Sequence, residues 1–365
     1  MKNFQAFDYQ EIVERKLHFD AIIDVRSEAE YLEDHIPGSI NCPVLTNEQR
    51  VEVGTIYKQI NAFEASKIGA AYVTRNISKF LEQLFHDKPR EWRPLIYCWR
   101  GGSRSGATAY IFSKVGWSVT QLDGGYKNFR KYVISELEKA PLNFKFSVIC
   151  GPTGSGKTRL LHHLSNVGEQ VLDLEELALH KGSVLGSHLD KEQPSQKSFD
   201  TSILTALSKF DFDRVIYVES ESKKIGNLQI PEQLMQNIRQ SPCVVVELPH
   251  EERIKILLEE YGDMLTNIDY LSKKLARLTL LHGNKTIDEW ISLASEGRLK
   301  DFVGEILKNH YDPAYSKSIK KNFVQQGIAK TIFIESGSAE SFEKAANQIV
   351  LDRRSNTGPA LSAEI

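Results

Sequence analysis

Apolar and polar residues follow two alternating patterns along the first 140 positions of the chain. Short apolar runs occur in DAIIDVRS, where a strand ends at Asp24, in PLIYC, which leads to Cys98, and in SVTQLDGGY, which ends in a glycine turn. The stretch KNFRKYVISELEKA then has apolar residues at the three- and four-residue spacing of an amphipathic helix. Strands that alternate with helices predict an α/β domain.

The pattern changes near residues 138–145, where we expect the boundary between two domains. The sequence PLN at 141–143 ends the preceding helix, and FKFSVIC begins a new strand. Beyond it, DRVIYVES and PCVVVELP are uninterrupted apolar runs, as expected for buried strands of a parallel sheet. The pattern is helical from about 250 to 325, and KTIFIES and ESFEKAANQIVLD then predict a last strand and a last helix.

Two domains of ordinary globular composition follow from these patterns. We expect an α/β domain over residues 1–140, a second α/β domain over 141–350 whose segment at about 250–325 is helical and basic, and an unstructured tail over 351–365. The 365 residues are 41% hydrophobic and 26% charged, which is typical of globular proteins. No apolar run is long enough to span a membrane, and the N-terminal sequence does not resemble a signal peptide, so we expect a cytoplasmic protein without a membrane partner.

The spacing of the four cysteines excludes some cofactor classes. Cys42, Cys98, Cys150 and Cys243 form no C-x-x-C pair. In a long chain without an export signal they are expected to be reduced thiols rather than a disulfide or zinc framework. We therefore expect no zinc site, and no motif in the sequence indicates flavin or haem.

Positive charge is concentrated in one segment. Residues 270–330 carry eleven Lys or Arg and six Asp or Glu, a net charge of +5, whereas residues 141–269 carry thirteen and nineteen, a net charge of −6. The whole chain has a formal charge of −2, so a polyanion would have to bind a local patch. The segment is either a solvated surface or a face that binds a polyanion. In the second case the candidate residues are Lys273, Lys274, Arg277, Lys320 and Lys321.

The sequence CWRGGSRSG places Cys98 at the end of an apolar strand, in a loop of small residues and cations. The small residues are Gly101, Gly102, Ser103 and Ser105. Such a loop can turn successive backbone amides toward an anion, and a helix is expected to begin at about Ser105. Arg100 and Arg104 add positive charge, and all of these features favour a thiolate. We interpret Cys98 as a nucleophile and the other three cysteines, which lack such surroundings, as core residues.

Two further segments flank this loop in order, DVRSEAEYLEDHIPGSIN over Asp24–Asn41 and LDGGY over Leu122–Tyr126. Together with Cys98 they resemble the rhodanese family over roughly residues 5–137. The resemblance implies that Cys98 carries a chalcogen as a persulfide-like species whose charge the loop amides hold. In one respect the chain differs, because Arg104 lies six residues after the cysteine rather than five, as in rhodanese-like phosphatases. The longer loop favours a selenium species or a phosphate-bearing donor over bare sulfur, and it leaves a phosphatase open.

The second domain begins with GPTGSGKT over Gly151–Thr158, between a predicted strand and a predicted helix. This is a complete P-loop in its required context, which binds a diphosphate and its metal. The expected diphosphate-binding residues are Gly151, Gly154, Ser155, Gly156, Lys157 and Thr158. Thr158 would also bind Mg²⁺, with Glu219 at the end of RVIYVE as the first candidate for a carboxylate ligand and Asp173 as the second. Either carboxylate could instead cap a helix, and ATP and a prenyl diphosphate both remain open as ligands.

Four more segments extend the similarity: DLEELALHKGSVLG, QPSQKSFD, VESESKKIGN and HYDPAYSKS. With the two motifs in this order, the chain resembles the bacterial tRNA 2-selenouridine synthases from Asp24 to about Ser318. The resemblance implies a transferase that acts on a 5-substituted 2-thiouridine at the tRNA wobble position. It implies that sulfur is replaced by selenium from selenophosphate and that the sulfur is geranylated with geranyl diphosphate.

The implied chemistry gives each site a role. Alkylation converts the thiouridine sulfur into a leaving group, so the P-loop, with Lys157 and Mg²⁺, would hold the geranyl diphosphate. Cys98 would carry the selenium, and Arg100 and Arg104 would hold the donor phosphate or the selenide. The residues do not tell which site binds selenophosphate. Three other functions remain open: a rhodanese-type sulfurtransferase with an accessory ATP-binding domain, a phosphatase, and a nucleotide-binding regulatory protein.

Overall fold

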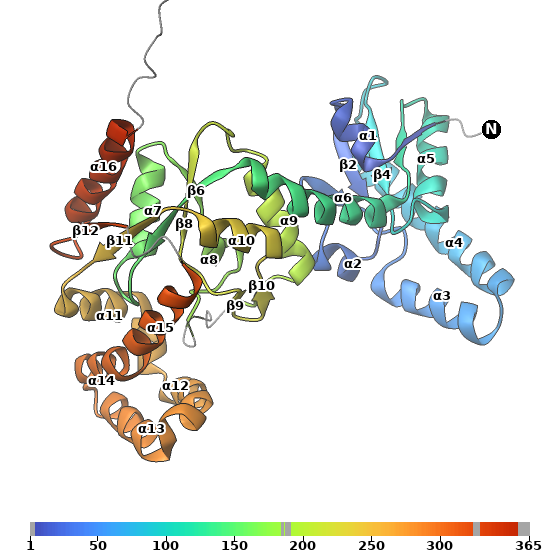
Figure 1. Ribbon diagram of the computed structural model, residues 1–365. Coiled ribbons are helices and arrows are strands. Elements are labelled where there is room, and N and C mark those ends of the chain that lie inside the picture. The colour runs from blue at the N-terminus through green and yellow to red at the C-terminus, as the bar shows by residue number, and fades with distance from the viewer. Residues whose placement is uncertain (1–3, 184–185, 187–190, 324–328, 357–365) are drawn as a thin grey trace, which may run out of the picture. The chain divides into compact units, whose positions relative to one another are not determined.

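The computed structural model describes residues 4–183, 186, 191–323 and 329–356, without the side chains of Asp263 and Lys320. The chain forms two compact units (Figure 1). The first consists of the residues up to 137 together with 194–205, and the second of 138–193 together with the residues from 206 onward. Each unit contains a five-stranded sheet whose paired strands are all parallel, which confirms the α/β prediction.

The sheet of the first unit has the strand order β1-β5-β4-β2-β3. Its strands are β1 (Gln5–Phe7), β2 (Ala21–Asp24), β3 (Ser39–Asn41), β4 (Pro94–Tyr97) and β5 (Thr120–Leu122). The helices are α1 (Tyr9–Glu14), α2 (Glu28–Glu33), α3 (Asn47–Gln59), α4 (Ala62–Phe80), α5 (Ser103–Val115) and α6 (Gly125–Lys139), with a π-helical turn over Leu81–Phe85. The central strand β4 is buried along its whole length, so Cys98 leaves the sheet at its centre.

The sheet of the second unit has the strand order β12-β11-β6-β8-β7, and a short antiparallel pair, β9 and β10, lies apart from it. Its strands are β6 (Lys145–Cys150), β7 (Gln170–Leu172), β8 (Val215–Glu219), β9 (Lys224–Ile225), β10 (Leu228–Gln229), β11 (Cys243–Glu247) and β12 (Lys330–Phe333). The helices around the sheet are α7 (Lys157–Asn166), α8 (Leu174–Leu177), α10 (Glu232–Gln240) and α16 (Ala339–Asn356), with a 3₁₀ turn over Ala140–Asn143 before β6, and α9 (Gln196–Leu207) lies between α8 and β8 in the sequence.

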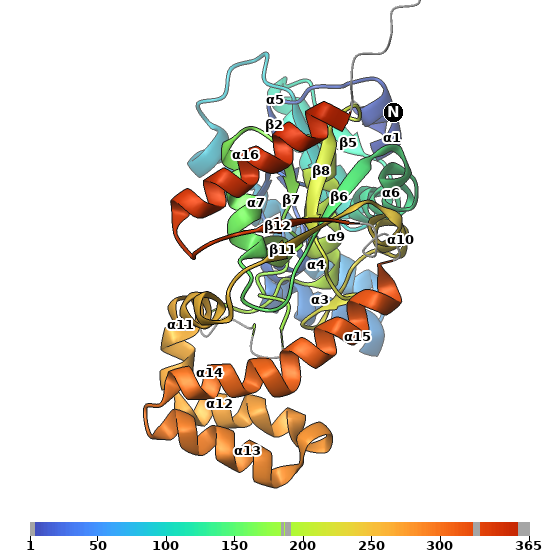
Figure 2. The same ribbon diagram turned by 60° about the vertical axis from the view of Figure 1, so that its left-hand side comes forward.

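Residues 250–322 form a helical segment with a hydrophobic core of its own. It comprises α11 (His250–Thr266), α12 (Ile268–Leu275), α13 (Thr279–Ser295), α14 (Leu299–Ile306) and α15 (Asp312–Asn322), with a 3₁₀ turn over Ala276–Leu278 and a π-helical turn over Leu307–Tyr311. Figure 2 shows α12, α13 and α14 side by side, and they enclose the buried side chains of Trp290 and Phe302. Among the described residues, no helix has the length and apolar character that a membrane span requires.

Most of α9 packs with the first unit, although it follows the P-loop in the sequence. Asp200 forms an ion pair with Arg130 of α6. The hydroxyl of Thr201 donates to Asp34 at 3.0 Å, where both residues are buried. The second domain that we expected to be continuous over 141–350 therefore differs from the structure at 194–205, because buried polar contacts join this segment to the first unit.

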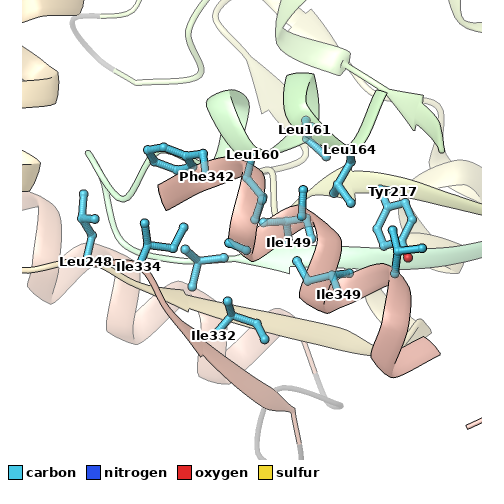
Figure 3. Close-up of a cluster of buried hydrophobic side chains, with 14 of the residues drawn as sticks. Ile149, Leu160, Leu161, Leu164, Tyr217, Leu248, Ile332, Ile334, Phe342 and Ile349 are labelled. Carbon is cyan, nitrogen blue, oxygen red and sulfur yellow. The ribbon is translucent and has the colours of Figure 1, made fainter. Parts of the chain in front are cut away.

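The core of the second unit lies between the sheet and two helices, α7 and α16 (Figure 3). Leu160 and Leu164 of α7 and Phe342 and Ile349 of α16 pack on the apolar side chains of β6, β8, β11 and β12. Helix α16 continues to Asn356, so the tail expected over 351–365 is wrong for residues 351–356. The last turns are held because Arg353 donates to both carboxylate oxygens of Glu169, at 2.7 and 2.8 Å. Residues 357–365 lie outside the described part of the chain.

Helix α16 also packs against the P-loop at Gly156. This residue has φ 74°, in the left-handed region, and a Cβ atom there would overlap the ring of Phe342. The sequence therefore needs glycine at this position for two separate reasons, the backbone conformation and the contact with α16.

A second glycine allows the energetic cost of the backbone conformation to be separated from that of the contact with Phe342. Gly168 also has positive φ, but nothing lies within 4 Å of its would-be Cβ. We expect Gly168→Ala to lower the free energy of unfolding by about 1–2 kcal/mol, from the backbone conformation alone. Gly156→Ala should cost about 1–3 kcal/mol more, because the new methyl group displaces the Phe342 ring. Urea unfolding of both variants would measure the difference, and Gly156→Ala should cost less in a Phe342→Leu background. Equal costs for the two alanine variants would contradict this account.

Candidate functional site

Cys98 lies at the centre of the first unit, between the end of β4 and the start of α5. Its side chain is buried, with 3% of the residue exposed. The hydroxyl of Ser105 donates to Cys98 Sγ at 3.1 Å, and Gln121 Nε2 on the neighbouring strand donates to Ser105 Oγ at 2.9 Å. A hydrogen bond to sulfur stabilises the thiolate more than the thiol, so this chain of contacts suits a nucleophilic cysteine.

The loop after Cys98 presents unpaired backbone amides. Within the described chain, the N–H groups of residues 100–105 have no hydrogen-bond acceptor, and α5 begins at Ser103, two residues before the expected Ser105. The loop is held from behind, because Tyr126 N donates to Cys98 O at 2.8 Å and Gln121 Nε2 donates to Gly101 O at 2.8 Å. A Cβ at Gly125, which has positive φ, would overlap Cys98 O, so only glycine allows this approach. Unpaired amides at a helix N-terminus form a site for an anion.

The two arginines of the loop have different surroundings. Arg104 donates to both carboxylate oxygens of Glu30, at 2.7 and 3.2 Å, and its charge is largely neutralised there. Burial alone would raise the pKa of Glu30, but the nearby charges of Arg104 and Arg50 lower it below its ordinary value. Arg100 is exposed, and within the described chain it forms no ion pair. A pocket of about 450 Å³ is lined by Cys98, Arg100, Arg104 and, from α3, Arg50. The sequence predicted Arg100 and Arg104 but gave no signal for Arg50.

The two motifs that flank the Cys98 loop, Asp24–Asn41 and Leu122–Tyr126, have a structural role. Asp24 and Arg26 form a buried ion pair in which Arg26 Nη2 lies 2.5 Å from Asp24 Oδ2, and Arg26 Nη2 also donates to Asp34 O at 2.7 Å. The guanidinium lies over the ring of Tyr126, whose hydroxyl donates to Asp34 Oδ2 at 2.8 Å. These contacts fix the ends of β2 and α6 around the Cys98 loop.

The remaining cysteines lie outside this pocket. Cys42 is buried in the core of the first unit, and burial raises the pKa of its thiol to about 12. Cys150 and Cys243 are buried on adjacent strands of the second unit. A hydrogen bond with Cys243 and then burial raise the pKa of the Cys150 thiol. The same hydrogen bond lowers the pKa of the Cys243 thiol, and burial opposes that decrease.

The P-loop of the second unit connects β6 to α7 and opens into a pocket of about 620 Å³. Gly151, Gly154, Gly156, Lys157 and Thr158 line the pocket. Ser155 is fully buried beside Gly151 and does not line the pocket, and its hydroxyl has no hydrogen-bond partner among the described residues. The structure thus brings the other predicted diphosphate residues together around one space.

Three carboxylates meet beside Lys157. One oxygen each of Glu175, Glu219 and Glu221 lies within 4.8 Å of the others, and Glu219 Oε2 is 3.9 Å from Lys157 Nζ. Burial raises the pKa of Glu219, while Lys157 and the hydroxyl of Thr158 oppose the rise. Burial and then repulsion from Glu219 raise the pKa of Glu175 to about 10 and that of Glu221 to about 7. Glu219 Oε1 is buried without a hydrogen-bond partner among the described residues, and the three carboxylates offer oxygen ligands of the kind that suit a divalent cation.

Of the two carboxylate candidates, Glu219 belongs to this cluster and Asp173 does not. Asp173 is the N-cap of α8, where its Oδ1 accepts from Glu176 N at 2.8 Å, and its Oδ2 is buried without a hydrogen-bond partner among the described residues. The sequence pattern did not predict Glu175 and Glu221, although both lie in segments that resemble the family, DLEELALHKGSVLG and VESESKKIGN. The alternation of Glu219 and Glu221 at the end of a strand was the available signal.

The predicted basic residues lie on two helices of the helical segment. Lys273 and Lys274 are in the last turn of α12, and Arg277 follows in the 3₁₀ turn. Lys273 and Arg277 are exposed, whereas Lys274 is half-buried with its ammonium over the ring of Tyr270. Lys321 is exposed on α15, and the side chain of Lys320 lies outside the described part.

Both units of the chain match models of known protein families. Residues 144–333 match the family model of the tRNA 2-selenouridine synthase AAA domain, and residues 8–132 match the rhodanese-like domain model. A protein of Hydrogenovibrio crunogenus named tRNA 2-selenouridine synthase is 34% identical over 348 residues, which cover 87% of this chain and 93% of that protein. A protein of the same name from Sulfurovum sp. is 30% identical, with the same two shares.

A third relative, the tRNA 2-selenouridine synthase of Nitrosomonas europaea, is 36% identical over 247 residues, which cover 66% of this chain and 63% of that protein. The AAA-domain model alone matches residues 144–333, more than half of the chain. With two relatives of at least 30% identity matched over nearly their whole length, the chain belongs to the tRNA 2-selenouridine synthase family.

Proposed function

We propose that this protein replaces the sulfur of a wobble-position 2-thiouridine in tRNA by selenium, in two steps that use its two sites. One observation carries the proposal: the same chain holds a diphosphate cradle and a buried thiol beside unpaired amides. Membership of the family connects the two sites to tRNA and to selenium. Neither site alone requires this reaction, but the reaction needs both.

The first step belongs to the P-loop pocket. The thiouridine sulfur attacks C1 of geranyl diphosphate, so that an S–C bond forms, the C–O bond breaks and diphosphate leaves. Lys157 and the amides of the P-loop lie where they can stabilise the charge that develops on the departing diphosphate.

Magnesium fits the donor set beside the P-loop. Thr158, Glu219, Glu175 and Glu221 offer only oxygen atoms, which are the ligands that Mg²⁺ takes. Glu219 Oε1 has no hydrogen-bond partner among the described residues, so it is available as a ligand. Bound Mg²⁺ neutralises charge on a leaving diphosphate.

The second step belongs to the Cys98 loop. We place the selenophosphate donor there, because the unpaired amides and Arg100 suit a phosphate. The Cys98 thiolate attacks C2 of the alkylated base, an S–C bond forms and geranyl thiol leaves. The selenium of selenophosphate then attacks C2, a C–Se bond forms and Cys98 leaves as a thiolate. Water cleaves the P–Se bond, which releases phosphate and leaves the selenouridine. Arg104 holds Glu30 rather than the donor, and so orders the loop from one side.

Substitution of Cys98 tests the function in cells. In a strain that lacks the protein, the Cys98→Ser variant should yield no selenouridine in tRNA, a loss of roughly a thousandfold or more, because a hydroxyl neither attacks C2 nor leaves from it as a thiolate does. S-geranylated thiouridine should accumulate instead, because the P-loop is intact. Mass spectrometry of tRNA nucleosides measures both products. Cys42→Ser is the matched control and should retain selenouridine. Selenouridine at the wild-type level in the Cys98→Ser strain would refute the role of Cys98 as nucleophile.

Substitution of Lys157 tests the ligand of the P-loop. Lys157→Ala should slow geranyl transfer to thiouridine-containing tRNA by roughly 100- to 1000-fold, because the leaving diphosphate loses its nearest fixed cation. Lys255→Ala, which removes an exposed lysine paired with Glu252 on α11, should leave the rate unchanged. Turnover assays with geranyl diphosphate measure both rates. If ATP occupies the wild-type pocket and geranyl diphosphate does not displace it, an ATP-binding function replaces the one proposed.

The salt dependence of tRNA binding tests the basic residues on α12. Each phosphate contact contributes a little under one unit to the slope of log affinity against log salt. The triple variant Lys273→Gln, Lys274→Gln, Arg277→Gln should therefore flatten the slope by roughly two to three units. A control triple variant with Gln at the exposed Lys114, Lys127 and Lys131 should retain it. Filter binding at several salt concentrations gives the slopes, and equal slopes for the two triple variants would move the tRNA surface elsewhere.

A further inference from the structure

An apolar crevice leads from the P-loop pocket into the helical segment of the second unit. Its inner wall consists of Leu257 and Leu265 from α11 and Phe302, Val303 and Ile306 from α14. All five belong to the hydrophobic core of the helical segment. Core residues that also line a cavity are unusual, because side chains in protein interiors are normally close-packed and leave few voids.

The crevice is continuous with the diphosphate pocket. Thr153, Leu257 and Tyr261 line both spaces. Leu257 lies directly beside Gly154 of the P-loop, where a Cβ would come within 3.0 Å of its side chain. A ligand whose diphosphate occupies the P-loop therefore has a hydrocarbon surface within reach of its next atoms.

The chemistry of the walls discriminates between ligands. The polar side chains that line the crevice are the hydroxyls of Thr153, Ser183, Tyr261 and Tyr311, and all four also line the P-loop pocket. The inner residues offer neither donors nor acceptors for a nucleobase edge. A hydrocarbon chain gains free energy from such a surface, at about 25 cal/mol per Å² of apolar area removed from water.

We propose that this crevice binds the end of the isoprenoid chain of the diphosphate donor; this inference rests on the proposed function. The crevice alone has a volume of about 30 Å³, so it admits only the terminal methyl groups of a chain. The two isoprene units lie against Leu257 and Tyr261 in the larger pocket, and the methyl groups that end the second unit enter between α11 and α14. The closed inner end then sets the length of the chain that fits.

Binding of a series of diphosphates tests the proposal with the full-length protein and Mg²⁺. The probes are inorganic pyrophosphate and the dimethylallyl, geranyl and farnesyl diphosphates, measured by calorimetry. In the wild type, affinity should rise at least roughly tenfold from dimethylallyl to geranyl diphosphate and should not rise further for farnesyl diphosphate. An affinity that does not depend on the chain would overturn the proposal.

Two variants with opposite effects locate the chain. Ile306→Ala deepens the crevice and should raise the affinity for farnesyl relative to geranyl diphosphate roughly tenfold. Val303→Phe fills it and should weaken geranyl diphosphate by a similar factor, with pyrophosphate unchanged in both variants. Ile287→Ala, in the same core but outside the crevice, is the matched control for lost stability and should keep the wild-type order.

The outcomes separate this inference from the proposed function. If Ile306→Ala and Ile287→Ala show the same chain-length order as the wild type while geranyl diphosphate still binds, the crevice does not hold the chain and the proposed function stands. If pyrophosphate and ATP bind but no prenyl diphosphate gains affinity over pyrophosphate, the proposed function fails and this inference fails with it.

Discussion

The buried guanidinium of Arg253 joins the parts of the chain that form the diphosphate pocket. From α11 it donates two hydrogen bonds to Thr153 O of the P-loop, at 2.9 and 2.7 Å, and it pairs with Asp312 at the start of α15. Arg253 is buried and the Asp312 side chain is 35% exposed, so solvent screens this pair in part, while the two hydrogen bonds to Thr153 O hold the guanidinium against the P-loop. The P-loop, the crevice between α11 and α14, and the position of α15 therefore depend on one side chain. Nothing in the P-loop motif itself indicates this dependence.

The two sites have electrostatic environments of opposite sign. Around Cys98 the protein supplies positive potential, from unpaired amides and Arg100, while Glu30 neutralises Arg104. Beside the P-loop it supplies an excess of buried carboxylate, against which Lys157 is the nearby cation. The first arrangement suits an anion, and the second would suit a divalent cation beside a diphosphate. A reaction that first removes a diphosphate and then delivers a selenium nucleophile uses both arrangements in turn.

Much of the fold follows from local sequence. The alternation of apolar runs and amphipathic stretches predicted two α/β sheets, and the strands that lead to Cys98 and to the P-loop lie where these runs are. Two features of the fold were not visible in that pattern. Residues 194–205 join the first unit through Asp200 and Thr201, and α16 continues to Asn356 because Arg353 reaches Glu169. In each case the partner is more than 60 residues away in the sequence, so no local pattern could report it.

The sequence by itself determined the two reactive centres, because a P-loop and a cysteine at the mouth of a strand obtain their chemistry from the backbone around them. A strand, a run of glycines and a helix start are local properties, and they place Cys98 and Lys157 without reference to the rest of the chain. Only the tertiary structure decided what surrounds those centres. It paired Arg104 with Glu30, brought Glu175 and Glu221 to Glu219 from separate elements, and opened the space between α11 and α14. Charge compensation and cavity shape depend on contacts between side chains that are distant in the sequence. Tertiary packing creates these contacts, and the spacing of residues along the chain does not predict them.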